Sequence, residues 1–200
     1  MGNKVLIATL YNPDPVILAS TKLGPDRLIL LIDKKPNKEQ EKSLSLIKSS
    51  LGKVIDVKAV KCEVYDIVSV ATKCVEIIDM QPKDDEIYVN ITSGRKTKAI
   101  GLLFAAYARH IRVKKIAYNP EEDKNSVIYL PRLSFKLNES QKKVLEYIHE
   151  GDYESITDLA NKIDMSRAML YRAIDDLKDM DLVSNEDGLK LTDAGKIARL

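Results

Sequence analysis

The chain has 200 residues, enough for one large domain or two modest ones, and its 44% apolar and 31% charged residues are typical of a soluble globular protein. No window approaches the roughly 18 uncharged apolar residues that a membrane-spanning helix needs. The first ten residues are too short and strand-like for a signal peptide. We therefore expect a cytoplasmic protein with no membrane association.

The cysteines and histidines are too scattered to indicate chemistry. Cys62 and Cys74 have no second pair of ligands, and His110 and His149 fall in unrelated helical segments. A metal site or a cysteine nucleophile is therefore not expected, and no catalytic residue is assigned.

The small net charge of +2 hides an asymmetry. Residues 1–134 carry 22 basic and 16 acidic side chains, whereas residues 135–200 carry 10 basic and 14 acidic ones. The first part is therefore the one suited to an anionic ligand.

Short apolar runs alternate with helical patterns through the first 130 residues. They predict strands at 5–10, 28–32, 54–60, 87–91, 115–118 and 127–130, and helices at 15–22, 38–51, 65–80 and 96–111. Such alternation predicts a Rossmann-like α/β domain with a mostly parallel sheet covered on both faces.

Right-handed crossovers restrict the topology, and the commonest doubly wound strand order is 3-2-1-4-5, in which the winding reverses between strands 1 and 4. Ligands of such folds bind at that crevice. The loops that border it are residues 9–13 and 92–96.

After residue 131 the pattern changes to short helices at 139–150, 156–163 and 166–178, followed by two apolar pairs around Asn185–Gly188. An Asp-Gly pair between apolar residues predicts a hairpin, and three helices with a hairpin form a winged helix-turn-helix. Residues 193–200 are expected to form a short closing helix. We place an α/β ligand-binding domain at 1–131, a linker at 132–137 and the winged helix-turn-helix domain at 138–200.

Two nucleotide-binding motifs are missing. The loop after the first strand has no glycine and contains Pro13 and Pro15, which disfavours a dinucleotide, and the chain has no P-loop motif.

The turn at residues 92–98 is the strongest candidate site. A helix start favours acidic side chains, yet this one carries Arg95, Lys96 and Lys98. Thr92, Ser93 and Gly94 add hydroxyls and a close backbone approach, so the turn suits phosphate. Alternatively, Ser93 caps the helix and the lysines are simply solvated.

The helix behind this turn has no charge on any face between residues 99 and 108. One face can pack on the sheet, whereas the other needs a cover, which is either a second subunit or a neighbouring helix. If two subunits pair here, two copies of the basic turn form one two-fold symmetric anion site.

The strand followed by Asn-Ile-Thr-Ser-Gly-Arg-Lys-Thr-Lys, the Thr-Leu-Tyr-Asn end of the first strand and the C-terminal winged helix together resemble the CARF family. More narrowly, the chain is similar to the CRISPR-associated archaeal transcriptional regulators that join CARF to a winged helix-turn-helix. The resemblance covers nearly the whole chain.

That resemblance implies a homodimer that binds a cyclic oligoadenylate, usually cyclic tetra-adenylate, as an allosteric ligand, with no cofactor. It assigns ligand binding to Thr9, Leu10, Tyr11, Asn12, Thr92, Ser93, Gly94, Arg95, Lys96 and Asn119. Tyr11 either stacks on adenine or packs within the domain.

The second domain contains the predicted DNA reader. Ser155 and Asp158 form a capping pair for one helix, and Leu170, Ile174 and Leu177 face the core of the next one. The residues placed near the major groove are Ser166, Arg167, Met169, Tyr171 and Arg172. The acidic tip, Glu186 and Asp187, should repel the DNA backbone, so either the wing does not contact DNA or binding is weak. The alternative is that the domain serves dimerisation or protein contact.

Together with the two-domain organisation, the resemblance implies a cyclic oligoadenylate-sensing regulator that binds double-stranded promoter DNA of CRISPR-associated genes in antiviral defence. One alternative is a weak ring nuclease in which Arg95 or Lys96 stabilises the transition state. Another is a repressor that senses a different phosphate-containing nucleotide.

Overall fold

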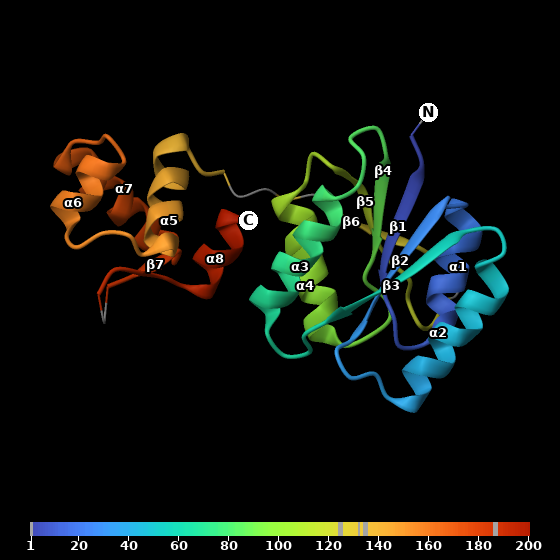
Figure 1. Ribbon diagram of the computed structural model, residues 1–200. Helices are drawn as coiled ribbons and strands as arrows, with labels where there is room; N and C mark the ends of the chain where they lie inside the picture. Colours follow the sequence, from blue (N-terminus) through green and yellow to red (C-terminus); the bar gives the residue numbers. More distant parts are fainter. Residues whose placement is uncertain (1, 124–125, 132, 134–135, 186–187) are drawn as a thin grey trace. The chain divides into compact units, whose positions relative to one another are not determined.

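The computed structural model describes residues 2–123, 126–131, 133, 136–185 and 188–200, which divide into two compact units at residue 134. The first unit is a six-stranded sheet with the strand order β3-β2-β1-β4-β5-β6 (Figure 1). Its strands are β1 (Lys4–Thr9), β2 (Arg27–Asp33), β3 (Asp56–Cys62), β4 (Glu86–Asn90), β5 (Val113–Tyr118) and β6 (Ile128–Leu130). The first five pair in parallel and β6 pairs antiparallel with β5, so the predicted fold class and strand order are confirmed.

Four helices cover the two faces of this sheet: α1 (Pro13–Leu23), α2 (Lys38–Leu51), α3 (Ile67–Asp79) and α4 (Lys96–Ala108). Figure 1 shows α1 and α2 on one face and α3 and α4 on the other. The helix starts follow local chemistry. For example, α1 begins two residues earlier than predicted because Asn12 caps it and Pro13 occupies its first turn.

The core is formed by the central strands, whose side chains are buried on both faces. In β1 and β2, all residues from Val5 to Thr9 and from Leu28 to Asp33 are buried. Near-continuous apolar strands are what a doubly covered parallel sheet requires. Of the two strands that line the predicted crevice, β1 is buried from Val5 to Thr9, and β4 is buried at Ile87, Val89 and Asn90.

The second unit contains α5 (Glu139–Glu150), α6 (Ile156–Lys162), α7 (Arg167–Asp179), β7 (Val183–Ser184), β8 (Lys190–Leu191) and α8 (Asp193–Arg199). The predicted hairpin is confirmed, since β7 and β8 pair antiparallel. The predicted core residues Leu170, Ile174 and Leu177 are 0–3% exposed. Glu186 and Asp187, the predicted acidic tip, lie outside the described residues.

Among the described residues, no helix is long and apolar enough to cross a membrane. The same part of the chain contains no group of three His, Cys, Asp or Glu side chains that could hold a metal ion. Cys62 and Cys74 are both buried and free, and burial raises the pKa of each thiol.

Candidate functional site

The two loops predicted to border the crevice meet at the carboxyl ends of β1 and β4, which are neighbouring strands. Ser93 joins them: its hydroxyl lies 2.9 Å from the amide nitrogens of both Tyr11 and Asn12 and 2.9 Å from the carbonyl oxygen of Asn12. The hydroxyl of Thr9 donates back to the carbonyl oxygen of Ser93. The first loop is therefore fixed to the second one by hydrogen bonds that need a small hydroxyl at residue 93.

Gly94 makes this approach possible. Its φ of +90° lies in the region that favours glycine, and a Cβ there would lie 3.1 Å from the Cβ of Thr9. Any larger residue would separate the loops that Ser93 and Thr9 hold together.

Helix α4 starts directly after this contact without a capping side chain. Its N-cap residue is Arg95, and no side chain within the described part of the chain bonds the first amides of the helix. The alternative in which Ser93 caps α4 is therefore wrong, because that hydroxyl is committed to the first loop. The first helical bond runs from Ala99 N to Arg95 O at 3.0 Å, which leaves the amides of Lys96, Thr97 and Lys98 without a helical acceptor.

The three basic residues of this turn have different surroundings. Lys96 is exposed, Arg95 is half-buried and Lys98 is fully buried. Arg95 and Lys98 both contact Asp33, the last residue of β2, so the protein itself supplies an anion for two of the three charges. Burial alone would raise the pKa of the Asp33 carboxyl, but hydrogen bonds from Lys98 and Arg95 hold it below its ordinary value.

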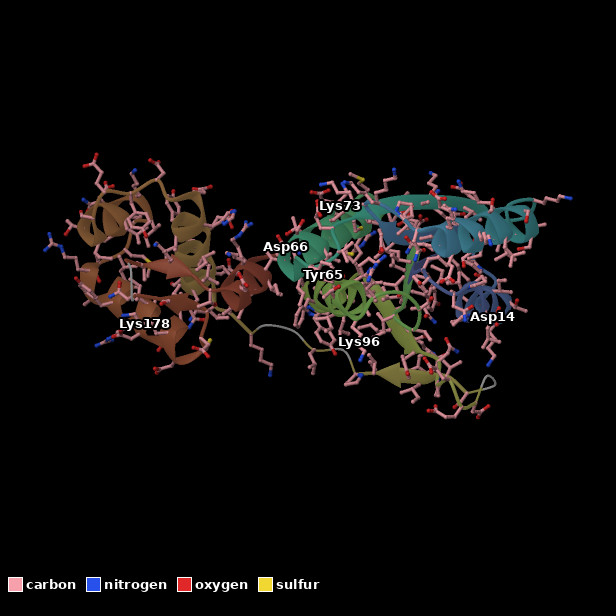
Figure 2. The ribbon with its side chains drawn as sticks, turned by 90° about the horizontal axis from the view of Figure 1, so that it is seen from below. Asp14, Tyr65, Asp66, Lys73, Lys96 and Lys178 are labelled. Atoms are coloured by element: carbon pink, nitrogen blue, oxygen red, sulfur yellow. The ribbon has the colours of Figure 1, made fainter. Side chains whose placement is uncertain are left out.

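A cleft of about 680 Å³ lies between α1 with the first loop and the residues that follow β4 and β5. Its wall includes Asn12, Thr92 and Asn119, three of the predicted ligand residues, together with the carboxylates of Asp14 and Glu121. Figure 2 looks onto the edge of the sheet where these loops lie and shows Asp14 on the side of α1, and Lys96 and Tyr65 on the side of α4 and α3. The site thus has a cationic side and a side rimmed by carboxylates.

Other predicted ligand residues serve to build the site. The side chains of Thr9 and Leu10 are fully buried, and that of Asn119 is 4% exposed. Asn119 accepts hydrogen bonds from Asn90 at 2.8 Å and from the Thr92 hydroxyl at 3.3 Å, and thereby ties the end of β5 to the end of β4. The hydroxyl of Tyr11 lies 3.0 Å from a carboxylate oxygen of Glu39, so at rest this ring is held against the start of α2.

The sequence interpretation did not identify Asp33, Gln40 and Tyr65. Asp33 carried a signal, because it is a charged residue at the end of an otherwise apolar strand. Gln40 is 1% exposed and carried none, since nothing in a polar helix start marks it as buried. Tyr65, whose ring centroid lies 5.8 Å from Cζ of Arg95, was visible only as the start of a helical pattern.

The predicted DNA-contacting residues lie together at the start of α7. Ser166 caps the helix by accepting from the Met169 amide at 3.3 Å. Arg167, Met169, Tyr171 and Arg172 are all exposed, while the opposite face of the helix is buried.

Two family models match the chain. The family described as "HFX_2341_N:-like, N-terminal" matches residues 5–123, and "Winged helix-turn-helix DNA-binding" matches residues 137–184. Among the curated proteins, no sequence matches this chain.

Several solved structures share the fold at low sequence identity. Can2 from Sulfobacillus thermosulfidooxidans in complex with cyclic tetra-adenylate is 15% identical, with a TM-score of 0.52 over 98% of this chain and 63% of its own. Enterococcus italicus Csm6 bound to cyclic hexa-2'-fluoro-hexa-dAMP is 18% identical, with a TM-score of 0.50 over 92% and 56%. Protein VC1899 from Vibrio cholerae is 10% identical, with a TM-score of 0.53 over 98% and 64%.

This chain therefore spans less than two thirds of the length of each of these three proteins. At these identities the likeness concerns the fold, which is the one that the CARF resemblance implied. The first unit carries the residues of the longer family match and the second carries a winged helix-turn-helix. The chain belongs to the HFX_2341-like N-terminal family, and its C-terminal part matches the winged helix-turn-helix DNA-binding model.

Proposed function

We propose that this protein is a DNA-binding regulator that senses a cyclic oligoadenylate, with cyclic tetra-adenylate as the first candidate, and acts on CRISPR-associated genes. One observation carries the proposal: the basic start of α4, which no described side chain caps, lies at the edge of the sheet beside a cleft. The fold is shared with Can2, whose structure contains cyclic tetra-adenylate.

The phosphates of such a ligand fit the start of α4. Free amides at a helix start and the positive end of the helix dipole favour an anion. Lys96 is exposed at this place, and within the described residues no ion pair engages it. Lys96 is therefore the side chain that is ready to meet a phosphate without first breaking another contact.

The bases fit the cleft beside the first loop. Asp14 and Glu121 disfavour a phosphate there, but a carboxylate readily accepts a hydrogen bond from the amino group of adenine. Ile17 and Leu18 supply an apolar wall for the ring. A ligand that carries both phosphates and adenines matches a site that has a cationic side and a side rimmed by carboxylates.

A homodimer would complete a ring-shaped site. Helix α3 covers one flank of α4, since Gly101 packs directly against Val70. The other flank still exposes 39% of Ile100, and Leu103 and Phe104 are only partly buried. A second copy on this uncharged stripe would bring two basic turns together about a two-fold axis. Ile100→Glu is expected to shift the protein from dimer to monomer in sedimentation velocity.

The ligand-binding proposal is tested by titrating the purified protein with cyclic tri-, tetra- and hexa-adenylate. We expect tight binding of one ring size and a loss of about tenfold in Lys96→Ala, the order of one charge-assisted hydrogen bond. Lys83→Ala is the matched control, because Lys83 is an exposed lysine before β4, at the opposite end of the strand.

No binding of any cyclic oligoadenylate by the wild-type protein would refute this function. Linear products in the mixture would instead indicate a ring nuclease, and loss of these products in Lys96→Ala would assign the cleavage to this site.

A further inference from the structure

Asp33 is shared by two cations that differ in their access to solvent. Its side chain is 4% exposed; Nζ of Lys98 donates to Oδ1, and Nε of Arg95 lies 2.9 Å from Oδ2. Lys98 is 0% exposed, whereas Arg95 is 40% exposed. One partner is therefore enclosed and the other stands at the surface of the crevice.

The cluster contains one more positive charge than negative charges, so one cation can leave without exposing a buried charge. A single carboxylate faces two positive charges, and the enclosed Lys98 is sufficient to neutralise it. Departure of Arg95 would therefore leave no buried charge without a partner, which is the costly outcome in a protein interior. If Lys98 were neutral, Arg95 would be the remaining counter-charge of Asp33 and would be held in place.

The backbone that carries this carboxylate is held in place. The side chain of Gln40 accepts a hydrogen bond from the Asp33 amide at 3.0 Å and donates to the carbonyl oxygen of Leu10 at 2.7 Å. This bridge joins the end of β2 to the first crevice loop. Asp33 therefore cannot follow Arg95, and the guanidinium is the part of the cluster that can move.

Arg95 also has a weaker resting contact at the surface. Its Nη1 lies 3.5 Å from the hydroxyl of Tyr65, a residue that is 78% exposed. Arg95 is the N-cap residue of α4, so its side chain leaves the backbone next to the free amides of the helix start. Those are the amides to which the proposed function assigns a phosphate.

We propose that Lys98 is a positioning residue that keeps Arg95 available to the ligand. By neutralising Asp33, Lys98 lets Arg95 exchange this carboxylate for a phosphate when the ligand binds. The inference rests on the proposed function, and it assigns a role in affinity to a lysine that is too deeply buried to touch the ligand.

The test compares the affinity for cyclic tetra-adenylate of four proteins: the wild type, Arg95→Ala, Lys98→Met and the double variant Lys98→Met/Asp33→Asn. Arg95→Ala is expected to bind about tenfold more weakly. Lys98→Met should lose a similar factor because Asp33 then retains Arg95. The double variant removes both buried charges, releases Arg95 and should return to within about threefold of the wild type.

The double variant separates positioning from mere folding. If Lys98 only supported the structure, a second substitution in the same cluster would not restore binding. Lys98→Gln, which keeps a donor to Asp33 without the charge, provides the same comparison if the methionine variant does not fold. Thermal unfolding followed by circular dichroism verifies that each variant is folded.

Wild-type affinity in Lys98→Met, or a double variant as weak as Lys98→Met, would overturn the inference while leaving the proposed function intact. Absence of binding by the wild-type protein itself would overturn the proposed function and this inference with it.

Discussion

The two domains hold their cations in different ways. In the first, Arg95 and Lys98 converge on one buried carboxylate, and the loops around them are tied by Ser93. In the second, Arg167 and Arg172 stand exposed on α7 over a buried apolar core. A cation that rests on a buried carboxylate has one defined position from which to meet a small ligand, whereas exposed arginines suit a long backbone of phosphates that they can meet in several ways.

The largest expected effect concerns the buried pair. Asp33→Asn leaves the buried Lys98 without a counter-charge and with a second cation, Arg95, nearby. This variant should destabilise the first domain by about 3–5 kcal/mol. The free energy of unfolding in urea measures this change. Asp56→Asn is the control, because that carboxylate is half-exposed in its contact with Arg27 and should cost under about 1 kcal/mol. Equal losses in both variants would contradict the difference between buried and exposed charge.

Close packing of α3 on α4 gives the next effect. A Cβ at Gly101 would lie 2.5 Å from Cγ1 of Val70, so Gly101→Ala should cost about 1–3 kcal/mol through overpacking. The loss should affect the unfolding of the first domain alone. The control is Ser49→Ala on the exposed face of α2, where an added or lost side-chain atom meets solvent. Gly151→Ala would not serve, because the positive φ of Gly151 is itself unfavourable for alanine. An unchanged midpoint in Gly101→Ala would show that the two helices are less tightly packed than described.

Substitutions on α7 should change DNA binding and leave stability unchanged. Each of Arg167→Ala and Arg172→Ala, if it contacts a phosphate, should lower the slope of log affinity against log salt by about 1. Lys178→Ala is the control on the same helix, because Lys178 lies near the C-terminal end of α7 (Figure 2). Its Nζ lies 3.9 Å from Oδ1 of Asp175. If Arg167→Ala and Arg172→Ala gave the same slope as Lys178→Ala and the wild type, a dimerisation role for this domain would be favoured. Measurement by fluorescence anisotropy at several salt concentrations separates the two.

The smallest effect is a dependence of stability on pH. The folded pKa of Asp33 lies below its ordinary value of 3.8. Its ionisation therefore stabilises the first domain above pH 3.8, and this contribution is lost as the pH falls through the folded pKa. The stability difference between the wild type and Asp33→Asn should be constant at higher pH and shrink below that value. A difference that begins to shrink near neutral pH would contradict the lowered pKa.

The fold was predictable because each element carries its own signal. Apolar runs marked the strands, and the commonest order among those that right-handed crossovers allow proved to be the observed one. The location of the candidate site followed from that order, since the ends of β1 and β4 must be neighbours.

The internal wiring of the site was not predictable. Residues 33 and 98 are separated by four elements in the chain, and no local pattern indicates which charges meet. Arg95 illustrates the consequence. Its position at a helix start suggested a side chain that is free to bind an anion, whereas in the structure it donates a hydrogen bond to Asp33.

The measurement that tests the central claim most directly is the affinity for DNA with and without ligand. The full-length protein would be titrated with a DNA fragment from upstream of its own gene, first alone and then with saturating cyclic tetra-adenylate. Coupling between the two domains predicts a change in DNA affinity of at least about fivefold, and DNA must change the ligand affinity by the same factor. Specific DNA binding that is identical in both conditions, despite demonstrated ligand binding, would contradict a ligand-responsive regulator.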